Sequence, residues 1–361
     1  MSTARSSGTP PRQSPGKLLA QELDSRGWTQ AEFAAVVGRP TQFVSEIVTG
    51  KKEITRESAA QLGAALGTYP EFWLRLQDRY LLRQQAKDTS TQQALSEVRR
   101  RARLHELAPI GTLRKRGVLT GTNLDELERQ VMDLFEIDDI DKEPDIAIAA
   151  RRSNHSEPVS PTQMAWVACV RRAARARDDV DTYSKKKLEL LASELPKLLK
   201  TPKQFRNLPV LFAAAGVSLI YVEAFPGAKI DGCSFMLEKM SVVGISGRGK
   251  RLDKILFTLL HEAAHIALGH VKSETIVETI DPHDKSSDET AANERASKWL
   301  LPTPLLDVPP RINASWVRLV ASQHDLAPIV VVGQLQNEGV LDWRTALAKN
   351  APSVGDELEA W

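Results

Sequence analysis

The chain has 361 residues, of which 42% are apolar and 26% are charged, and its formal net charge is +2. This length predicts two or three domains, and this balance is typical of a soluble globular protein. No apolar run approaches the roughly 20 residues that a membrane-spanning helix needs, so we expect no membrane partner. Residues 1–14 lack the apolar segment of a secretory signal and are expected to form a disordered lead-in. With only two cysteines, Cys169 and Cys233, a disulfide framework is disfavoured and a reducing cytoplasm is favoured.

The net charge conceals a difference between two parts of the chain. Residues 1–120 contain 19 basic and 11 acidic side chains, a net charge of +8. The remaining residues contain 29 basic and 35 acidic side chains, a net charge of −6. A basic segment of this kind favours a polyanionic partner, usually nucleic acid, although a solvated basic face fits the charge equally well.

Residues 15–85 are expected to form an all-α domain of five short helices. The first helix carries an apolar stripe of leucines and ends at Gly27. Thr29 caps the second, and Glu32 three residues later completes a capping box. The remaining three are expected over 41–48, 56–66 and 70–84.

Residues 86–205 are expected to form a helical linker or middle region. Amphipathic patterns predict helices over 164–176 and 188–199, and the acidic stretch 138–143 predicts a loop. The basic run at 99–103 is interpreted as an exposed helix face.

Near residue 206 the predicted secondary structure changes from helices alone to a mixture of helices and strands. A helix is expected over 208–215, a strand of β-branched residues over 217–222, and a hairpin over 232–237 and 241–245. The edge of this hairpin could receive an extended peptide, or it could be ordinary sheet packing. Two further helices are predicted over 252–269 and 288–301.

His261 and His265 stand four residues apart on one of these helices, so both imidazoles lie on one face, one turn apart. Zinc prefers such nitrogen ligands. Glu262, next to the first histidine, can face the open coordination position and act as the general base that takes a proton from water and passes it to the leaving amine. The pattern therefore predicts a zinc centre with a catalytic carboxylate.

A catalytic zinc has three protein ligands and one open position. We expect the third ligand to be Glu289 on the downstream helix. Asn293 lies one turn later on the same face and could hold the free ring nitrogen of a ligand histidine. The neighbouring Asp288 and Glu294 are weaker ligand candidates. Cys233 could also approach the metal, or be a small buried hydrophobe.

Four segments of residues 205–350 carry a family resemblance, namely Phe225–Gly232, Phe257–His265, Glu289–Asn293 with Leu300–Pro302, and Pro328–Gln336. Together they resemble the ImmA/IrrE family of zinc metallo-endopeptidases. The resemblance implies a zincin-like fold, His261, His265 and Glu289 as zinc ligands, and Glu262 as the catalytic carboxylate. Members of this family are cytoplasmic and typically cleave or remodel a transcriptional repressor.

Residues 15–85 resemble the HigA-type antitoxin helix-turn-helix domain, within the larger class of XRE-type repressors. The resemblance rests on Pro15–Leu19, Trp28–Ala34, Val44–Thr55 and Ala65–Leu74. Such domains usually bind DNA as dimers, which makes Phe72, Trp73 and Leu76 candidate interface residues. A four- or five-helix protein-binding module is the alternative.

The third helix is the one that would enter the major groove of DNA. Thr41, Gln42 and Ser45 lie on its expected exposed side and can hydrogen-bond base edges. Residues placed to hold phosphates are Gln30, Lys51 and Lys52. Glu46 lies among them although a carboxylate repels phosphate, so it either reads a cytosine or caps a neighbouring side chain.

The predicted fold is therefore multidomain, with an all-α helix-turn-helix N-terminal domain (15–85), a helical middle region (86–205) and an α+β zincin-like metallopeptidase domain (206–361). The predicted function is a cytoplasmic DNA-binding regulator fused to a zinc-dependent endopeptidase that cleaves a repressor or another partner protein. The alternative is a HigA-like antitoxin or transcription factor whose metallopeptidase fold senses metal or binds a partner such as a toxin without turnover.

Overall fold

The computed structural model describes residues 13–144, 159–271, 287–303, 305 and 308–361. Most of the lead-in expected over residues 1–14 lies outside the described residues. The chain divides into two compact units, Met1–Arg99 and Arg100–Trp361.

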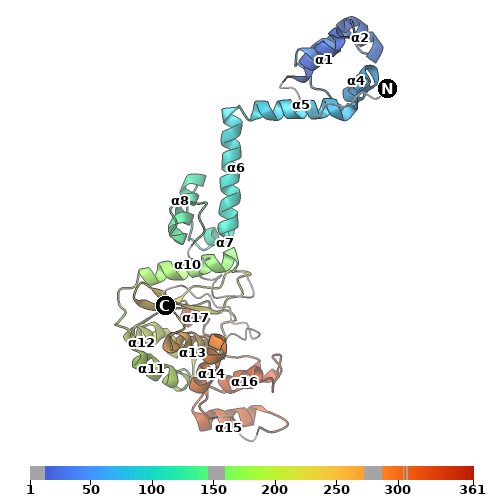
Figure 1. Ribbon diagram of the computed structural model, residues 1–361. Helices are drawn as coiled ribbons and strands as arrows, with labels where there is room; N and C mark the ends of the chain where they lie inside the picture. Colours follow the sequence, from blue (N-terminus) through green and yellow to red (C-terminus); the bar gives the residue numbers. More distant parts are fainter. Residues whose placement is uncertain (1–12, 145–158, 272–286, 304, 306–307) are drawn as a thin grey trace. The chain divides into compact units, whose positions relative to one another are not determined.

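The first unit is built from short helices, as the sequence predicts (Figure 1). They are α1 (Pro15–Asp24), α2 (Gln30–Val37), α3 (Thr41–Val48), α4 (Arg56–Leu66) and α5 (Pro70–Gln85), followed by the start of α6 (Thr89–Leu107). The capping box at the start of α2 is present: the Thr29 backbone donates to Glu32 Oε2 at 2.7 Å, and the Glu32 backbone donates to Thr29 Oγ1 at 3.2 Å. These two bonds satisfy amide groups that the first turn of a helix leaves without partners.

The core of the first unit corrects one expectation about the dimer interface. Trp73 is fully buried and Leu76 is 5% exposed, and both pack in the same hydrophobic cluster as Phe33. The indole of Trp73 also donates to Thr68 Oγ1 at 2.8 Å. Trp73 and Leu76 therefore stabilise the domain from inside, and only Phe72, which is 41% exposed, remains available to a partner.

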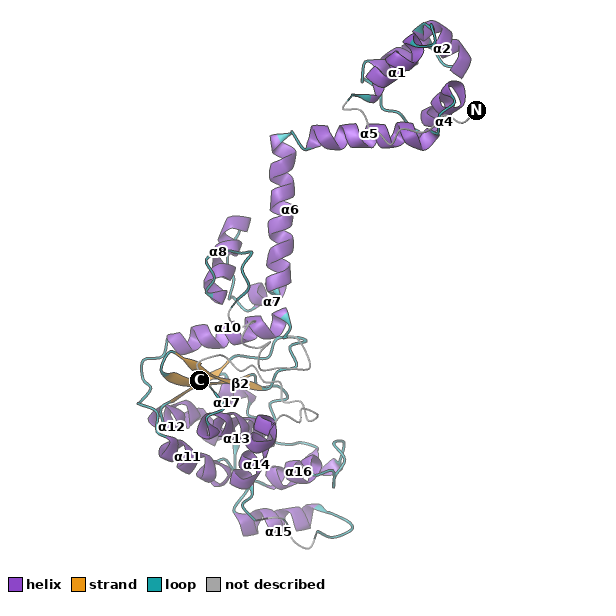
Figure 2. Cartoon of the chain, in the orientation of Figure 1, coloured by secondary structure: helices purple, strands orange, loops and turns teal. Residues whose placement is uncertain are grey.

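A three-stranded sheet forms the centre of the second unit (Figure 2). Its strands are β1 (Val217–Tyr221), β2 (Gly232–Leu237) and β3 (Met240–Ile245), in the order β1-β3-β2. β1 runs parallel to β3, and β2 runs antiparallel to it, with Gly232 opposite Ile245. The predicted hairpin is therefore present, and β2 lies at an edge of the sheet.

The two faces of the sheet are covered by different helices, because successive side chains of a strand point to opposite faces. Val243 and Ile245 join the cluster around α13 (Leu252–Leu268), whereas Val242 joins the cluster around α10 (Pro161–Arg175). In Figure 2 the strands lie between these two helices. The cluster around α13 also includes residues of α11 (Lys185–Leu198), α12 (Leu208–Ala214), α14 (Ser287–Leu300), α15 (Ala314–His324), α16 (Pro328–Asn337) and α17 (Gly355–Leu358).

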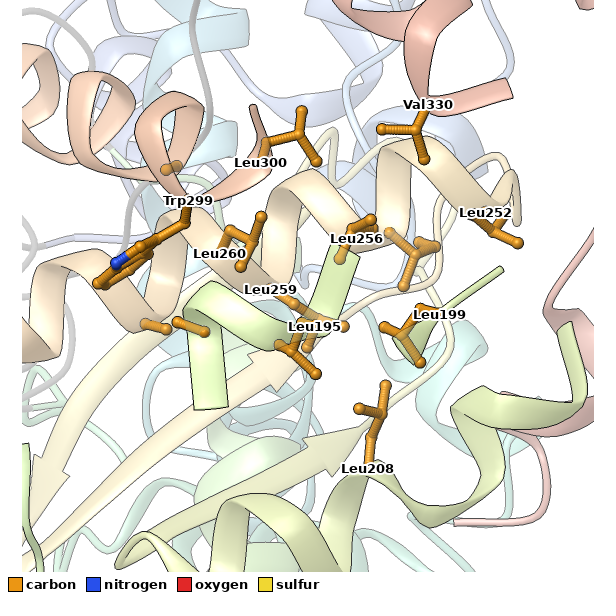
Figure 3. Packing of buried hydrophobic residues seen from close by; sticks show 14 of the residues in the cluster. Leu195, Leu199, Leu208, Leu252, Leu256, Leu259, Leu260, Trp299, Leu300 and Val330 are labelled. Atoms are coloured by element: carbon orange, nitrogen blue, oxygen red, sulfur yellow. The ribbon is translucent and has the colours of Figure 1, made fainter. Parts of the chain in front are cut away.

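Figure 3 shows how this cluster surrounds α13. Leu300 of α14 and Val330 of α16 lie on one side of the helix, and Leu195, Leu199 and Leu208 lie on the opposite side. Residues on nearly every face of α13 are buried, so the helix that carries the two histidines is fixed within the core. Such burial holds a side chain in one position, since interiors are close-packed.

The first helices of the second unit pack within its core. α7 (Ile110–Lys115) and α8 (Leu124–Phe135) contribute Leu113 and Phe135 to the cluster around α10. Arg100 pairs with Glu128 at 2.6 Å, and Arg103 donates to the carbonyl of Ile140 at 3.0 Å. Two arginines of the basic run that was expected on an exposed face, Arg100 and Arg103, therefore bind an acidic side chain and a carbonyl of this unit, whereas Arg99 and Arg101 are exposed.

Short elements complete the second unit near the end of the chain. The two 3-10 helices are η1 (Pro202–Asn207) and η2 (Ala346–Ala348). Trp361 donates from its indole to the carbonyl of Phe205 at 3.1 Å, which ties the last residue to η1. Across the described residues, we find no helix with the length and apolar character that crossing a membrane requires.

Candidate metal centre and nucleic-acid interface

The centre is built on α13, where His261 and His265 lie one turn apart and are both fully buried. Their Nε2 atoms face each other at 3.1 Å. The helix is fixed by leucines on several faces, so neither ring can turn freely out of this position.

The first turn of α14 brings a carboxylate to the two rings. Glu289 is 3% exposed, and its two oxygens lie 3.4 Å from His261 Nε2 and 3.4 Å from His265 Nε2. The three ligand atoms all lie within 4.8 Å of one another. Tetrahedral zinc bonds of about 2.0–2.1 Å place two ligand atoms roughly 3.3 Å apart. The sequence-predicted triad is therefore brought together with the spacing that one small metal ion requires.

The imidazole of His261 is held in the form that can bind a metal. Burial and, to a smaller extent, the neighbouring His265 lower the pKa of His261 to about 4, while Glu289 acts in the opposite direction. At neutral pH the ring is neutral and keeps a lone pair, which ligation requires.

Two polar side chains adjoin the ligand histidines. Asn293, on the face of α14 that carries Glu289, interacts with the side chain of His261. His270, just beyond the end of α13, places its Nδ1 3.0 Å from His265 Nδ1. Its other nitrogen lies 3.9 Å from an oxygen of Asp288.

The sequence prediction missed His270, since it lies outside the helical periodicity. The available signal was the pair Gly269-His270, in which the left-handed glycine that ends α13 turns the chain back toward the helix. Asp288, one of the two weaker ligand candidates, lies beside His270.

Glu262 is fully buried next to the triad but is not one of its members. It lies directly under the start of β2: a β-carbon added to Gly232 would meet Glu262 Oε1 at 2.6 Å and Thr258 Cγ2 at 2.9 Å. Only glycine leaves room for the carboxylate here. Glu262 therefore lies between the ligand helix and the edge strand of the sheet.

Cys233 follows Gly232 but points away from the triad. It is fully buried in the cluster around α10, and burial raises the pKa of its thiol well above the usual range, with the charge of Glu262 acting in the same direction. A protonated thiol in an apolar cluster is a poor metal ligand. Of the two interpretations of Cys233, the structure supports the buried hydrophobe.

The residues expected to contact DNA lie on and around α3. Thr41 and Gln42 are exposed, and Ser45 is half-buried, on a helix whose other side is anchored by Val44 and Ile47. The three phosphate candidates come from neighbouring segments: Gln30 begins α2 and is half-buried, and Lys51 and Lys52 follow α3 and are exposed. This arrangement leaves one polar surface on α3.

Glu46 is engaged within this surface. Its carboxylate accepts from Gln42 Nε2 at 2.9 Å and lies 3.8 Å from the ammonium of Lys52. The same ammonium lies 4.9 Å above the ring of Phe43, while Arg39 approaches this ring at 5.2 Å. Glu46 therefore orients two of the candidate DNA-binding side chains.

Comparison with known families identifies both parts of the chain. Residues 19–74 match the helix-turn-helix family, and residues 216–314 match the family of the IrrE N-terminal-like domain. The chain joins a helix-turn-helix domain to an IrrE-like peptidase-family domain. The matched part of the IrrE-like domain contains the histidine pair, Glu262 and Glu289.

Individual relatives match the helix-turn-helix domain. The chain is 32% identical over 73 residues to the uncharacterized HTH-type transcriptional regulator YddM of Escherichia coli, which covers 20% of this chain and 78% of that protein. It is 38% identical over 71 residues to virulence-associated protein A' of Dichelobacter nodosus, covering 19% and 62% of the two chains. Among solved structures, an addiction module antidote protein of a HigA family from Coxiella burnetii is 34% identical, with 22% of this chain and 89% of that chain covered and a TM-score of 0.22.

Proposed function

We propose that this protein is a DNA-binding transcriptional regulator fused to a zinc-dependent endopeptidase that cleaves a repressor or another partner protein. The observation that carries the proposal is the buried triad of His261, His265 and Glu289, with ligand atoms 3.1–3.4 Å apart and the carboxylate of Glu262 beside it. Three buried ligands of this kind form a site that leaves a coordination position open, which is typical of catalytic rather than structural zinc.

The donor set fits zinc because it combines two neutral imidazoles with one carboxylate. When bound, a zinc ion acts as a Lewis acid that polarises a carbonyl group and lowers the pKa of water. His261, His265 and Glu289 would hold it. His270 would fix the ring of His265, since partners of the second ring nitrogen orient ligand histidines. Asn293 would have to approach Nδ1 of His261, which has no hydrogen-bond partner among the described residues.

Glu262 is the proposed general base. Its carboxylate would accept a proton from the attacking water and then donate that proton to the amine of the departing peptide. Glu262 is a buried residue of α13, and its carboxylate lies against Gly232. This burial excludes bulk water from the proton transfer and holds the carboxylate in one place.

The edge strand offers a way to orient the substrate. Among the residues that the structure describes, β2 is paired on only one side, and it begins at Gly232, directly over Glu262. An extended peptide that adds to this edge gains main-chain hydrogen bonds and passes the catalytic carboxylate. We therefore propose that the substrate binds as an additional strand.

The test incubates the purified, zinc-loaded chain with the product of the neighbouring gene. We expect a single cut that a chelator abolishes. Glu262→Gln should keep zinc and DNA binding while cleavage falls by at least ~10²-fold, the usual scale for loss of a general base. The control is Glu294→Gln on the exposed side of α14, which removes a similar charge and should cleave normally.

A reporter strain separates this proposal from metal-dependent binding without turnover. His265→Ala should abolish regulation in both cases, because it removes a ligand. Glu262→Gln should abolish regulation only if hydrolysis is required. Regulation that survives Glu262→Gln would contradict the peptidase proposal and support a sensor or antitoxin role.

A further inference from the structure

A pocket of about 340 Å³ lies along the first half of α13, the helix that carries the proposed catalytic carboxylate. Its wall includes Phe257 and Thr258, one turn before His261 and Glu262. The ring of Phe257 stacks on that of His261 with centroids 6.3 Å apart, and the methyl of Thr258 lies beside Gly232 together with Glu262. The pocket is therefore continuous with the wall of the proposed active site.

The floor of the pocket is apolar. Ile255 and Val330 are each 2% exposed and Leu300 is 5% exposed, so three helices contribute aliphatic side chains from the core. Figure 3 shows Leu300 and Val330 on the same side of α13. The hydroxyl of Thr258 donates to the carbonyl of Lys254 at 3.0 Å and so is satisfied within the helix.

Three of the four charged side chains that line the pocket have an ion-pair partner, and the fourth is Lys254. Asp253 accepts from the guanidinium of Arg251 at 2.9 Å and 2.5 Å. At the rim, Arg248 lies 3.5 Å from Asp231. An occupant with its own charge would find these three side chains already engaged, and burying it would incur a desolvation penalty.

The rim adds an aromatic surface. Trp343 is 56% exposed, and the ammonium of Lys254 lies 5.5 Å from the centre of its ring. An apolar floor with an aromatic rim favours a bulky apolar side chain, since the free energy of burial grows with the apolar area removed from water. The volume lies within the roughly 300–1,000 Å³ of small-ligand sites, which is more room than a small side chain fills.

From this continuity and this chemistry we infer that the pocket selects the substrate residue next to the scissile bond, and that this residue carries a large aromatic or aliphatic side chain. The inference rests on the proposed peptidase function. A peptide that lies along β2 passes Asp231, which lines the pocket, and Gly232, which covers Glu262, in consecutive positions. One side chain of that peptide would therefore point into the pocket while its backbone crosses the carboxylate.

Val330 and Val332 provide a matched pair for the test. Both are valines of α16 that are 2% exposed, but Val330 lines this pocket, whereas Val332 lines a separate pocket with Val317 and Ala314. Truncating either valine removes the same atoms and costs similar stability. Only Val330→Ala enlarges the proposed specificity pocket.

The probes are short end-blocked alanine peptides with alanine, leucine, phenylalanine or tryptophan at one central position. Binding is measured by NMR titration of the full zinc-loaded Glu262→Gln protein, so that affinity is read without turnover. We expect the phenylalanine peptide to bind at least about 10-fold tighter than the alanine peptide, because the larger side chain buries more apolar area and so gains binding free energy. In the background of Glu262→Gln, Val330→Ala should shift the preference toward tryptophan by about 10-fold, and Val332→Ala should leave it unchanged.

Equal affinity for the alanine and phenylalanine peptides overturns the inference, as does binding of neither, or the same shift in both valine variants. Cleavage is scored separately with the native chain. Size-selective binding without cleavage would leave the pocket in place and contradict the peptidase proposal, whereas cleavage without size selectivity would contradict only the pocket.

Discussion

Replacing Gly232 by alanine should disable the proposed chemistry without touching a metal ligand. The added β-carbon would lie 2.6 Å from Glu262 Oε1, whereas ordinary van der Waals contact begins at 3.4 Å. The carboxylate must therefore move by about 0.8 Å, and a misplacement near 1 Å lowers catalysis by about 10²-fold. The three nearest atoms to this β-carbon belong to Glu262 and Thr258, so the ligand triad should stay in place.

The assay compares kcat/KM and zinc content for Gly232→Ala and for a matched control. Gly111→Ala is the control, because it lies in a helix of the same unit and an added β-carbon there meets nothing within 4 Å. We expect Gly232→Ala to keep its zinc and its thermal unfolding midpoint within a few degrees while kcat/KM falls by about 10²-fold, and Gly111→Ala to match the native protein. Native activity in Gly232→Ala, or loss of its zinc, would refute the reasoning that places Glu262 against the strand.

Three further outcomes follow from the contacts described above. His270→Ala should weaken zinc affinity by about 10–100-fold, measured by competition with a chelating dye, because His265 loses the partner of its second ring nitrogen. In DNA-binding titrations at several salt concentrations, Lys52→Ala should weaken all sequences alike and reduce the salt slope by about 1, whereas Gln42→Ala should reduce the preference for the operator over random duplex. Burial raises the pKa of Cys169 to about 11, so its thiol should react slowly with an alkylating reagent at neutral pH and rapidly once the chain is unfolded.

Local signals in the sequence were sufficient for most helices and for the membership of the triad. The expected bounds of 41–48 and 56–66 agree with α3 and α4. A proline precedes the first helix, and a glycine follows shortly after the last residue of each helix. His261 and His265 could be paired because helix geometry alone puts residues four apart on one face. Glu289 could be added because it begins a predicted helix at a point where the family resemblance expects an acidic ligand.

Contacts between distant residues could not be predicted in this way. Arg100 pairs with Glu128, and α8 packs against α10. Neither contact produces a hydrophobic periodicity in the sequence. Trp73 was expected at a surface, but its helix buries the face on which it lies. The contact of Gly232 with Glu262 depends on which strand of the sheet is at the edge, and a sequence pattern does not specify that order.

The pH dependence of stability offers a test of the buried ligand that needs no substrate. In the metal-free protein, burial and the neighbouring His265 lower the pKa of His261 from 6.5 to about 4. Above pH 6.5 the ring is neutral in both the folded and the unfolded chain, so its contribution to stability is fully present. As the pH falls from 6.5 toward 4, the unfolded chain takes up the proton first, and the free energy of unfolding decreases.

The loss should be on the order of 3 kcal/mol over this range, since one pKa unit corresponds to 1.36 kcal/mol. It would be measured by urea unfolding of the chelator-treated chain between pH 7 and pH 4. His261→Gln removes the titrating group, so the decrease in the free energy of unfolding between pH 7 and pH 4 should be smaller by about that amount. His105→Gln, at an exposed position of α6, should leave this decrease unchanged. Zinc should steepen the dependence for the native chain, because the metal binds the neutral ring and competes with the proton. An equal slope in the native chain and in His261→Gln would show that His261 is not the buried neutral ligand described here.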